Sequence, residues 1–260
     1  MAEKRLKERT YIVTGGTQGL GRGVAEHLAA EGAGAILICG RNRKNGALAR
    51  KAVEEAGSRC VYVEADLLDE EQCRNVVLRA GEEFGAIHGL INAAGLTNPG
   101  VLEETTVELW DLLMNVNARA PFILMQETVR NMREHGTRGS IVNMISDNCH
   151  GGSPDLVAYA ASKGALATLT KNLAHGLLEE RIRVNGVCLG WTYTPAEHEK
   201  QVKMGHPENW LEEAERQKPF GRLLRPSDIA YLTAYLLSDE AEMMTGALID
   251  FDQKVIGAFG

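Results

Sequence analysis

Short apolar runs rich in β-branched residues alternate along the chain with longer stretches whose apolar residues recur at helical spacing. The runs that fit strands span residues 11–13, 35–39, 60–63, 89–92, 141–145, 183–187 and 248–251. The stretches that fit crossover helices span 20–32, 43–56, 70–85, 107–134 and 156–180. This alternation predicts an α/β fold, a doubly wound parallel sheet of about seven strands covered by helices on both faces.

One domain is expected. No repeat, low-complexity tract or Pro/Ser-rich linker interrupts the pattern, so residues 1–260 are assigned to a single domain. The segment 191–225 is too irregular and too charged for a crossover helix. Because it follows a strand end, we interpret it as a substrate lid with a short helix near 208–217.

Composition excludes several classes of partner. The net charge is −7, and Lys and Arg are scattered, which argues against nucleic acid as a partner. The charged start, MAEKRLKERT, leads into a short apolar run, without a signal-peptide core or a stretch long enough to cross a membrane. We therefore expect a cytoplasmic protein with no membrane partner.

The cysteines and histidines give no metal signal. The five cysteines are widely and unevenly spaced, without a CxxC pair, so buried and reduced thiols are expected. Glu197, His198 and Glu199 could ligate a metal in principle, but a solvated loop is the preferred interpretation. No metal site is predicted.

A glycine-rich turn, Thr14-Gly-Gly-Thr-Gln-Gly-Leu-Gly21, follows the first predicted strand and opens a helix. Glycines let the backbone approach a pyrophosphate closely, and the helix offers free N–H groups. The position favours a Rossmann-like dinucleotide site, although the turn could be glycine-rich for steric reasons alone. Cofactor contacts are expected from Gly15, Thr17, Gln18, Gly19, Leu20 and Gly21.

The second strand ends in Cys39-Gly-Arg-Asn-Arg43, where an NAD site would place a carboxylate. Arg41 and Arg43 instead suit a 2'-phosphate, which favours NADP(H) and leaves NAD(H) possible. Two arginines that merely open a solvated helix are the alternative, and Gln18 in place of a basic residue weakens the NADP case. Asp66, with Leu67, is placed to meet the adenine, but it could equally cap the helix that begins near Asp69.

Tyr159 and Lys163 lie four residues apart on a predicted helix and hence on one face. A nearby ammonium can stabilise a phenolate, which acid–base work near neutrality requires. The pair is weak evidence alone. Ser146, at the end of the fifth strand, can donate to a carbonyl oxygen that gains charge, or it can be a plain strand-end or cap serine. The ends of parallel strands share one edge, where open α/β sheets bind ligands.

The residues in this order resemble the short-chain dehydrogenase/reductases over nearly the whole length of the chain. The matching elements are TGxxxGxG at 14–21, Asn-Ala-Ala-Gly at 92–95, Asn117, Ser146, the Y-x-x-x-K pair at 159–163 and Arg-Val-Asn at 183–185. The chain departs from the family pattern at Leu189-Gly190, where Pro-Gly is usual.

The resemblance implies a role for each catalytic residue. Tyr159 would be the proton donor or acceptor, and Lys163 would lower its pKa and hold the nicotinamide ribose. Ser146 would orient the substrate oxygen. Asn117 would support a water-mediated proton path through a local helix distortion, with Asn115 as a competing candidate.

The resemblance also extends the cofactor and assembly predictions. Further cofactor contacts are implied for Asn92, Ala93, Gly95, Tyr159, Lys163, Gly190, Thr192 and Thr194. The family usually forms tetramers through helices that correspond to 107–134 and 156–180, so a homotetramer is expected.

Specificity is expected from the residues after Ser146 and from the lid, with Ser146, Asn148, Tyr159 and Trp191 contacting substrate. Polar residues gather in both places, which favours a sugar, polyol or hydroxy acid, although many of them could face water. The polar residues are Asp147, Asn148, His150, Glu197, His198, His206, Glu208 and Asn209. A 3-oxoacyl-[acyl-carrier-protein] reductase is the runner-up, against which the lack of a basic patch counts. A non-catalytic, cofactor-binding regulator is the alternative of another class.

Overall fold

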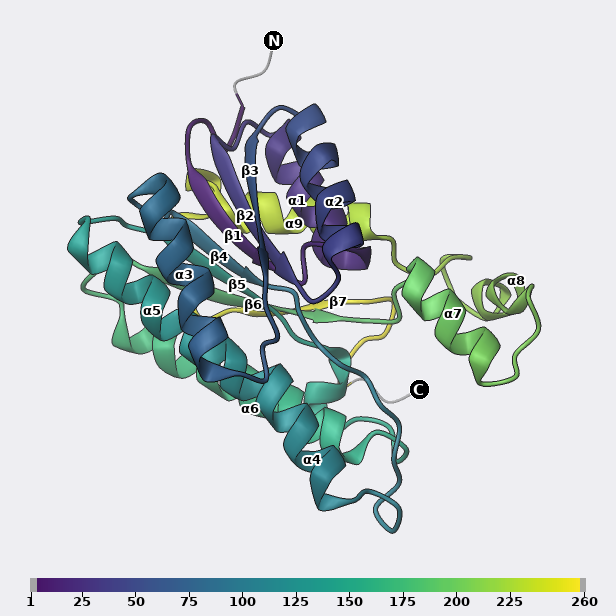
Figure 1. The fold of residues 1–260 in the computed structure, drawn as a ribbon. Helices are drawn as coiled ribbons and strands as arrows, with labels where there is room; N and C mark the ends of the chain where they lie inside the picture. Colours follow the sequence, from purple (N-terminus) through teal and green to yellow (C-terminus); the bar gives the residue numbers. More distant parts are fainter. Residues whose placement is uncertain (1–3, 258–260) are drawn as a thin grey trace.

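The computed structural model describes residues 4–257, which contain one seven-stranded, all-parallel sheet (Figure 1). The strand order is β3-β2-β1-β4-β5-β6-β7. The bounds are β1 Thr10–Thr14, β2 Ala35–Gly40, β3 Arg59–Glu64, β4 Gly89–Asn92, β5 Ser140–Met144, β6 Arg183–Leu189 and β7 Leu248–Phe251. The predicted doubly wound single domain is confirmed.

Helices cover both faces of the sheet, as Figure 1 shows. One face carries α1 (Gly19–Ala30), α2 (Arg43–Glu55) and α9 (Pro226–Leu237). The other carries α3 (Glu70–Phe84), α5 (Ala120–Glu134) and α6 (Val157–Gly176). Successive residues of β1 pack on opposite faces of the sheet: Ile12 lies in the core with α3, α5 and α6, and Val13 lies in the core with α1, α2 and α9. Burial on both faces explains why the five inner strands read as continuous apolar runs.

The long helical stretch 107–134 is not one helix. It divides into α4 (Val107–Met114), a five-residue π-helical segment (Asn115–Arg119) and α5. Pro121 lies at the start of α5, where it lacks the N–H that a continuous helix would need. The local distortion implied by the family resemblance is therefore present at the expected place.

The segment 191–225 contains two helices, α7 (Pro195–Lys203) and α8 (Trp210–Arg216), which stand out from the sheet in Figure 1. The helix predicted near 208–217 is confirmed as α8. The loop expected at Glu197 to Glu199 is wrong, because those residues lie in α7. That helix begins with Pro195 and is capped by the Thr194 hydroxyl.

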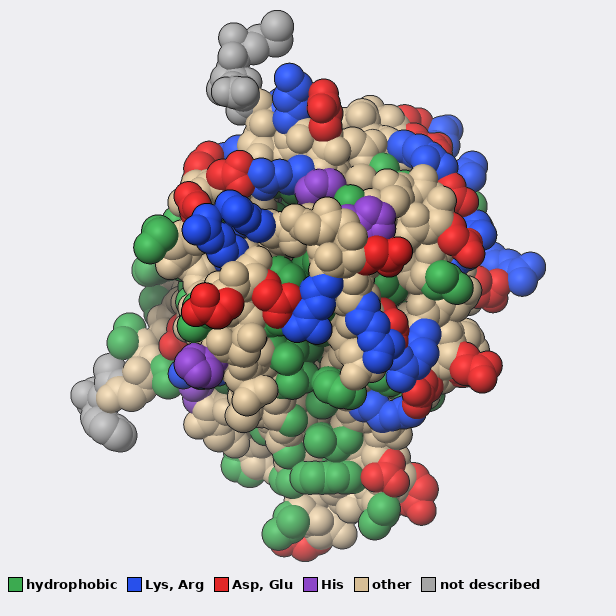
Figure 2. Space-filling model, turned by 90° about the vertical axis from the view of Figure 1, so that its left-hand side faces the viewer, with side chains coloured by type: hydrophobic (Ala, Val, Ile, Leu, Met, Phe, Trp, Pro, Cys, Tyr) green, Lys and Arg blue, Asp and Glu red, His purple; other side chains and the backbone are tan. Residues whose placement is uncertain are grey.

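The surface is of mixed charge. Figure 2 shows acidic and basic side chains interspersed over the upper part of one face, and hydrophobic side chains gathered lower, at the height of α4 and α6 in Figure 1. No helix within residues 4–257 is long and apolar enough to cross a bilayer.

Candidate active site

The loops that follow β1 and β4 touch at the carboxyl edge of the sheet. The Thr14 hydroxyl accepts hydrogen bonds from the backbone N–H groups of Ala93 and Ala94, both at 3.1 Å. A Cβ added to Gly15 would lie 2.9 Å from the Ala94 Cα, so the close approach requires glycine there. The predicted meeting of strand ends is therefore present.

The glycine loop leaves the N-terminus of α1 open. Gly15 and Gly19 have φ of 63° and 53°, and a Cβ on Gly21 would lie 2.5 Å from the Gly15 carbonyl oxygen. Gln18, the N-cap residue of α1, provides no side-chain cap. Asn42 and Asp69, by contrast, cap α2 and α3. Uncapped N–H groups behind a glycine cradle fit a pyrophosphate.

Other loop residues join this turn to β2. The Gln18 side chain accepts from the Asn45 amide at 2.9 Å. Thr17 is buried against Gly40, where a Cβ would lie 2.6 Å from the Thr17 hydroxyl oxygen. Leu20 lies in the first turn of α1 and packs against the core.

The end of β2 differs from the prediction in one respect. Glu64, the register partner of Gly40 on β3, forms an ion pair with Arg43, so a carboxylate is present after all and one of the two arginines is engaged. Arg41 is exposed and has no ion pair within the described residues. Arg41 is therefore the cation available to a ligand.

The residues after β3 form a turn rather than a cap. The Asp66 carboxylate accepts from the Leu68 N–H at 3.1 Å, and Asp69 caps α3 by accepting from the Gln72 N–H. The alternative in which Asp66 caps the helix is wrong. The Leu67 carbonyl accepts from the Cys73 thiol, which fixes this turn on α3.

Tyr159 and Lys163 are buried on one face of α6. The Lys163 Nζ donates to the Met144 carbonyl at 2.8 Å and lies 5.9 Å from the centroid of the Tyr159 ring. Burial raises the pKa of Tyr159, and hydrogen bonding with Ser146 and Thr97 opposes that shift. Burial lowers the pKa of Lys163 to about 8. The lowering of the Tyr159 pKa by Lys163, implied by the resemblance, stays a prediction.

The buried Lys163 ammonium is expected to lower the stability of the folded protein near neutral pH. Its pKa falls from 10.5 to about 8 on folding, so the unfolded chain binds more protons and stability rises across that window. At pH 7, burial of the charge lowers the free energy of unfolding by on the order of 3 kcal/mol, and the hydrogen bond of the ammonium offsets about 1 kcal/mol of that loss. Lys163→Met should raise Tm at pH 7 by roughly 4–8 °C, with the gain fading towards pH 10.5. Calorimetry beside the exposed control Lys171→Met checks this, and a lower Tm at pH 7 would contradict it.

Ser146 lies just beyond β5 and has two functions in the structure. Its Oγ donates to the Asp147 carboxylate at 3.1 Å and accepts from the Asn148 amide at 3.2 Å. It also accepts from the Asn148 N–H, so it caps the short 3-10 helix Asp147–His150. Lys254 pairs with Asp147 at 2.8 Å. The Asn148 side chain, a predicted substrate contact, is thus occupied in orienting Ser146.

Asn117 is fully buried in the π-helical segment. Its Oδ1 accepts from the Leu96 N–H and its Nδ2 donates to the Leu96 carbonyl, each at 2.9 Å. The same Nδ2 donates to the Ser162 hydroxyl at 3.0 Å. A Cβ on Gly95 would lie 3.3 Å from the Asn117 Oδ1 and 3.4 Å from the Lys163 Nζ. The segment therefore ties the loop after β4 to α6. This position favours Asn117 over Asn115 for the predicted role.

Asn92 ends β4 with an unsatisfied acceptor. Its amide nitrogen donates to Asn143 at 2.8 Å, whereas its buried Oδ1 has no hydrogen-bond partner among residues 4–257. Ala93 follows it at the contact with β1. A buried acceptor at the ligand edge of the sheet costs free energy unless another group meets it.

The loop after β6 leads to α7. A Cβ on Gly190 would lie 2.1 Å from the Asp252 carboxyl carbon, which leaves no room for another residue. The Thr192 hydroxyl donates to the Gly190 carbonyl at 3.0 Å. Thr194 lies against Gly19, so the glycine loop and the start of α7 are in contact.

An aromatic cluster occupies the segment 191–225. Trp191 stacks on Trp210 with centroids 5.4 Å apart. The Trp191 indole N–H donates to Glu197 at 2.9 Å, and that of Trp210 donates to His198 at 3.1 Å. Two polar groups expected to face substrate are therefore used to hold this cluster together.

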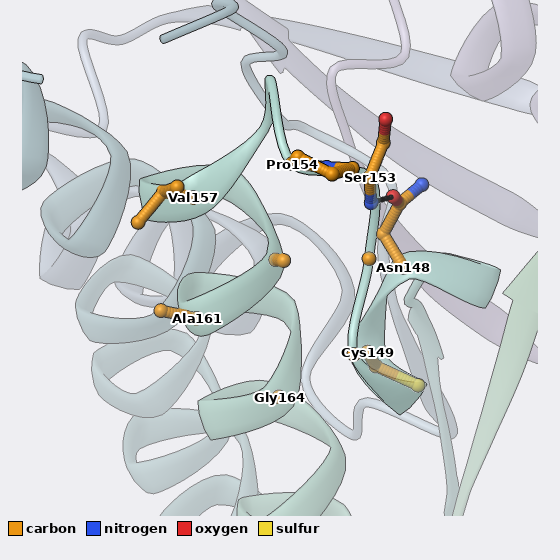
Figure 3. Close-up of a pocket in the computed structure, with 10 residues that line it drawn as sticks. Asn148, Cys149, Ser153, Pro154, Val157, Ala161 and Gly164 are labelled. Carbon is orange, nitrogen blue, oxygen red and sulfur yellow. Dashed lines mark hydrogen bonds between the residues drawn. The ribbon is translucent and has the colours of Figure 1, made fainter. Parts of the chain in front are cut away.

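A cavity of about 500 Å³ lies between α6 and residues 148–154 (Figure 3). Val157, Ala160, Ala161 and Gly164 line its α6 side. Helical periodicity places Val157, Ala161 and Gly164 away from the face that carries Tyr159 and Lys163. This cavity is therefore distinct from the catalytic edge.

Comparison with known proteins agrees with this geometry. A family model described as "Enoyl-(Acyl carrier protein) reductase" matches residues 15–253. The NADP-dependent (R)-specific alcohol dehydrogenase of Lentilactobacillus kefiri is 34% identical over 246 residues, which cover 94% of each chain. The chain belongs to the short-chain dehydrogenase/reductase family.

Solved structures extend the likeness. A levodione reductase has 30% identity and a TM-score of 0.89, with 96% of this chain and 98% of that chain covered. An actinorhodin polyketide ketoreductase with NADPH has 28% identity and a TM-score of 0.89, with 95% and 96% covered. As a short-chain dehydrogenase/reductase, the protein is an NAD(P)-dependent oxidoreductase that acts on CH–OH or carbonyl groups.

Two residues of this short-chain dehydrogenase/reductase site were missed in the sequence. Thr97 reaches Tyr159 from the loop after Asn-Ala-Ala-Gly, and Lys254 reaches Asp147 from the segment after β7. Thr97 lies two residues past a recognised motif, which was a usable signal. Lys254 is 107 residues from its partner, so no local pattern could have found it.

Proposed function

We propose that this enzyme interconverts an alcohol and a carbonyl on a small polar molecule, a sugar, polyol or hydroxy acid, with preference for NADP(H). The observation that carries the proposal is the Tyr159 phenol, buried beside the Ser146 hydroxyl at the sheet edge that also bears the open N-terminus of α1. A proton donor, an oxygen-binding hydroxyl and a phosphate cradle at one edge suit this chemistry.

The described residues fit a nicotinamide dinucleotide. Residues 15–21 would hold the pyrophosphate, Asp66 and Leu67 would lie near the adenine, and the unsatisfied Asn92 oxygen with Ala93 and Gly95 would meet the cofactor beyond β4. Gly190, Thr192 and Thr194 would line its far end. When bound, the nicotinamide supplies or accepts the hydride.

The side chains then have separate tasks. The Tyr159 hydroxyl gives its proton to the oxygen during carbonyl reduction and takes it back during alcohol oxidation. The Ser146 hydroxyl donates to the same oxygen as negative charge develops. The Lys163 ammonium, buried under the site, supports the phenolate. Asn117 holds the loop after β4 against α6, so that the groups that exchange protons keep a fixed position relative to one another.

Arg41 is proposed to bind the 2'-phosphate of NADP(H). The L. kefiri relative is described as NADP-dependent, and the ketoreductase structure contains NADPH. A charge-assisted contact of about 1.5–3 kcal/mol predicts that Arg41→Ala lowers the NADP/NAD ratio of kcat/KM by roughly 10- to 100-fold. Arg43→Ala is the matched control and should change the ratio much less, since Arg43 pairs with Glu64. An unchanged ratio in Arg41→Ala would remove this residue from cofactor choice.

The segment 191–225 is proposed as a substrate lid. Asp147, Asn148 and Lys254 surround Ser146 with polar side chains, which suits a polar substrate. The stacked Trp191 and Trp210 favour a second candidate, a ketone on a cyclic or aromatic framework, because flat apolar surfaces pack on indole rings.

The test is a panel of polyols, aldoses, hydroxy acids and cyclic ketones, assayed in both directions with both cofactors at the nicotinamide absorbance band. Highest kcat/KM on a polar member supports the polar-substrate proposal. Highest kcat/KM on cyclic ketones supports the second candidate. Cofactor binding without turnover of any member would favour the non-catalytic regulator.

A homo-oligomer, expected to be a tetramer, is proposed to assemble through α4, α5 and α6. Val107 and Trp110 on α4 and Phe122 on α5 are exposed apolar residues that a second copy would cover. Light scattering should give a mass well above the 28.3 kDa chain, and Trp110→Glu should shift the protein towards monomer. A wild-type monomer at micromolar concentration would contradict this proposal.

A further inference from the structure

Cys149, His150 and Cys188 form a cluster beneath the turn that carries Ser146. One ligand atom from each lies within 4.8 Å of the others. The three come from two elements: Cys149 and His150 from the 3-10 helix Asp147–His150, and Cys188 from β6. Two thiols and an imidazole are donors that soft divalent metals prefer.

The spacing of the two sulfurs fits a shared metal. The Cys149 and Cys188 Sγ atoms lie 3.7 Å apart. Two thiolates on a tetrahedral zinc, each with a bond of about 2.3 Å, stand about 3.8 Å apart. Figure 3 shows the Cys149 sulfur pointing away from α6 and from the cavity that its backbone lines. The thiol is therefore aimed at β6 rather than at the cavity.

The histidine already has the partner that metal-binding imidazoles use. Its Nε2 lies 2.7 Å from the Asp250 Oδ1. Asp250 is the register partner of Cys188 on β7, so both side chains leave the same face of the sheet, towards the 3-10 helix. A carboxylate bonded to one ring nitrogen orients the imidazole and raises the basicity of the other.

We propose that Cys149, His150 and Cys188 bind one zinc ion, with Asp250 as the orienting group and a water in the fourth position. Cys188 is buried and His150 is partly exposed, so the ion enters from the His150 side. Both thiol protons leave to solvent on binding. The site is separate from the hydride-transfer chemistry.

Metal there would fasten the catalytic turn to the sheet. The Cys149 N–H donates to the Ser146 carbonyl at 2.9 Å, and Ser146 caps the helix that bears both Cys149 and His150. A bond from Cys149 through the metal to β6 holds that turn in place. Binding to the folded state alone raises its stability by mass action.

The experiment uses tag-free, full-length protein, reduced and stripped with chelator, then titrated with Co²⁺ and afterwards Zn²⁺. We expect one equivalent of Co²⁺ with a thiolate-to-cobalt charge-transfer band, displaced by Zn²⁺, and a Tm that rises with Zn²⁺ concentration. Cys149→Ser and Cys188→Ser should each abolish the band. Asp250→Asn should weaken binding about 10- to 100-fold. Cys60→Ser, a thiol outside the cluster, is the matched control and should bind as wild type does.

Three results would overturn the proposal. One is a reduced wild type that gives no charge-transfer band, and another is a band that persists in Cys188→Ser. The third is a wild-type protein that binds no metal and in which hydrogen peroxide oxidises the Cys149 and Cys188 thiols to a disulfide, which neither cysteine variant forms. Because metal binding is read without substrate or cofactor, these results are independent of the proposed hydride transfer.

Discussion

Replacing Tyr159 with phenylalanine is expected to lower kcat/KM by about 10²- to 10⁴-fold in both directions. The change removes one hydroxyl from a buried ring and leaves the packing of α6 intact. Without that hydroxyl, the proton donor of the proposed mechanism is lost, whereas the glycine loop and Arg41 should still hold the cofactor.

Steady-state kinetics and a fluorescence titration with NADPH, on the same preparation, separate chemistry from binding. Tyr231→Phe, at an exposed tyrosine on α9, is the matched control and should retain wild-type activity. Wild-type turnover in Tyr159→Phe would remove this residue from the mechanism. A parallel loss of cofactor affinity would indicate a structural defect instead.

Ser146→Ala is expected to lower kcat by about 10²- to 10³-fold, because the developing negative charge on the oxygen loses a hydrogen-bond donor. The same change removes the cap of the 3-10 helix Asp147–His150, at about 1 kcal/mol of stability. Thermal unfolding measured beside the kinetics distinguishes the two effects.

Two further variants sharpen that test. Ser146→Thr keeps a hydroxyl and should recover much of the lost kcat. Ser153→Ala, in the same loop, is the control and should leave kcat unchanged. Equal kcat in wild type and Ser146→Ala would reduce Ser146 to a capping residue, the alternative that its position also allows.

The strands could be predicted closely from the sequence because the five inner ones are buried on both faces, and the partly buried edge strands β3 and β7 still carry short apolar runs. Helix α7 was missed because the charges at Glu197, His198 and Glu199 resemble a solvated loop. The missed signal was Thr194-Pro-Ala-Glu197, a capping-box pattern with proline at the first helical position.

The candidate catalytic residues could be proposed from the sequence because Ser146 and the Asn-Ala-Ala-Gly loop lie at strand ends, which a parallel sheet brings to one edge. Tyr159 and Lys163 lie on the helix that follows the strand of Ser146. Contacts between strands were beyond the sequence. The ion pair of Arg43 with Glu64 depends on the register of β2 against β3, and the approach of Cys149 to Cys188 depends on where the turn after β5 lies on β6. No local pattern encodes either distance.

We infer that hydride passes between a nicotinamide cofactor and a carbonyl carbon at the Tyr159 edge of the sheet. The most direct measurement uses NADPH with deuterium at both C4 positions of the nicotinamide ring and the best carbonyl substrate from the panel, followed by mass spectrometry and NMR of the product. We expect an alcohol with one deuterium on its carbinol carbon in wild type, and at least a hundredfold slower formation of it in Tyr159→Phe. Product formed without the label, or formed equally fast by the variant, would contradict this hydride-transfer mechanism.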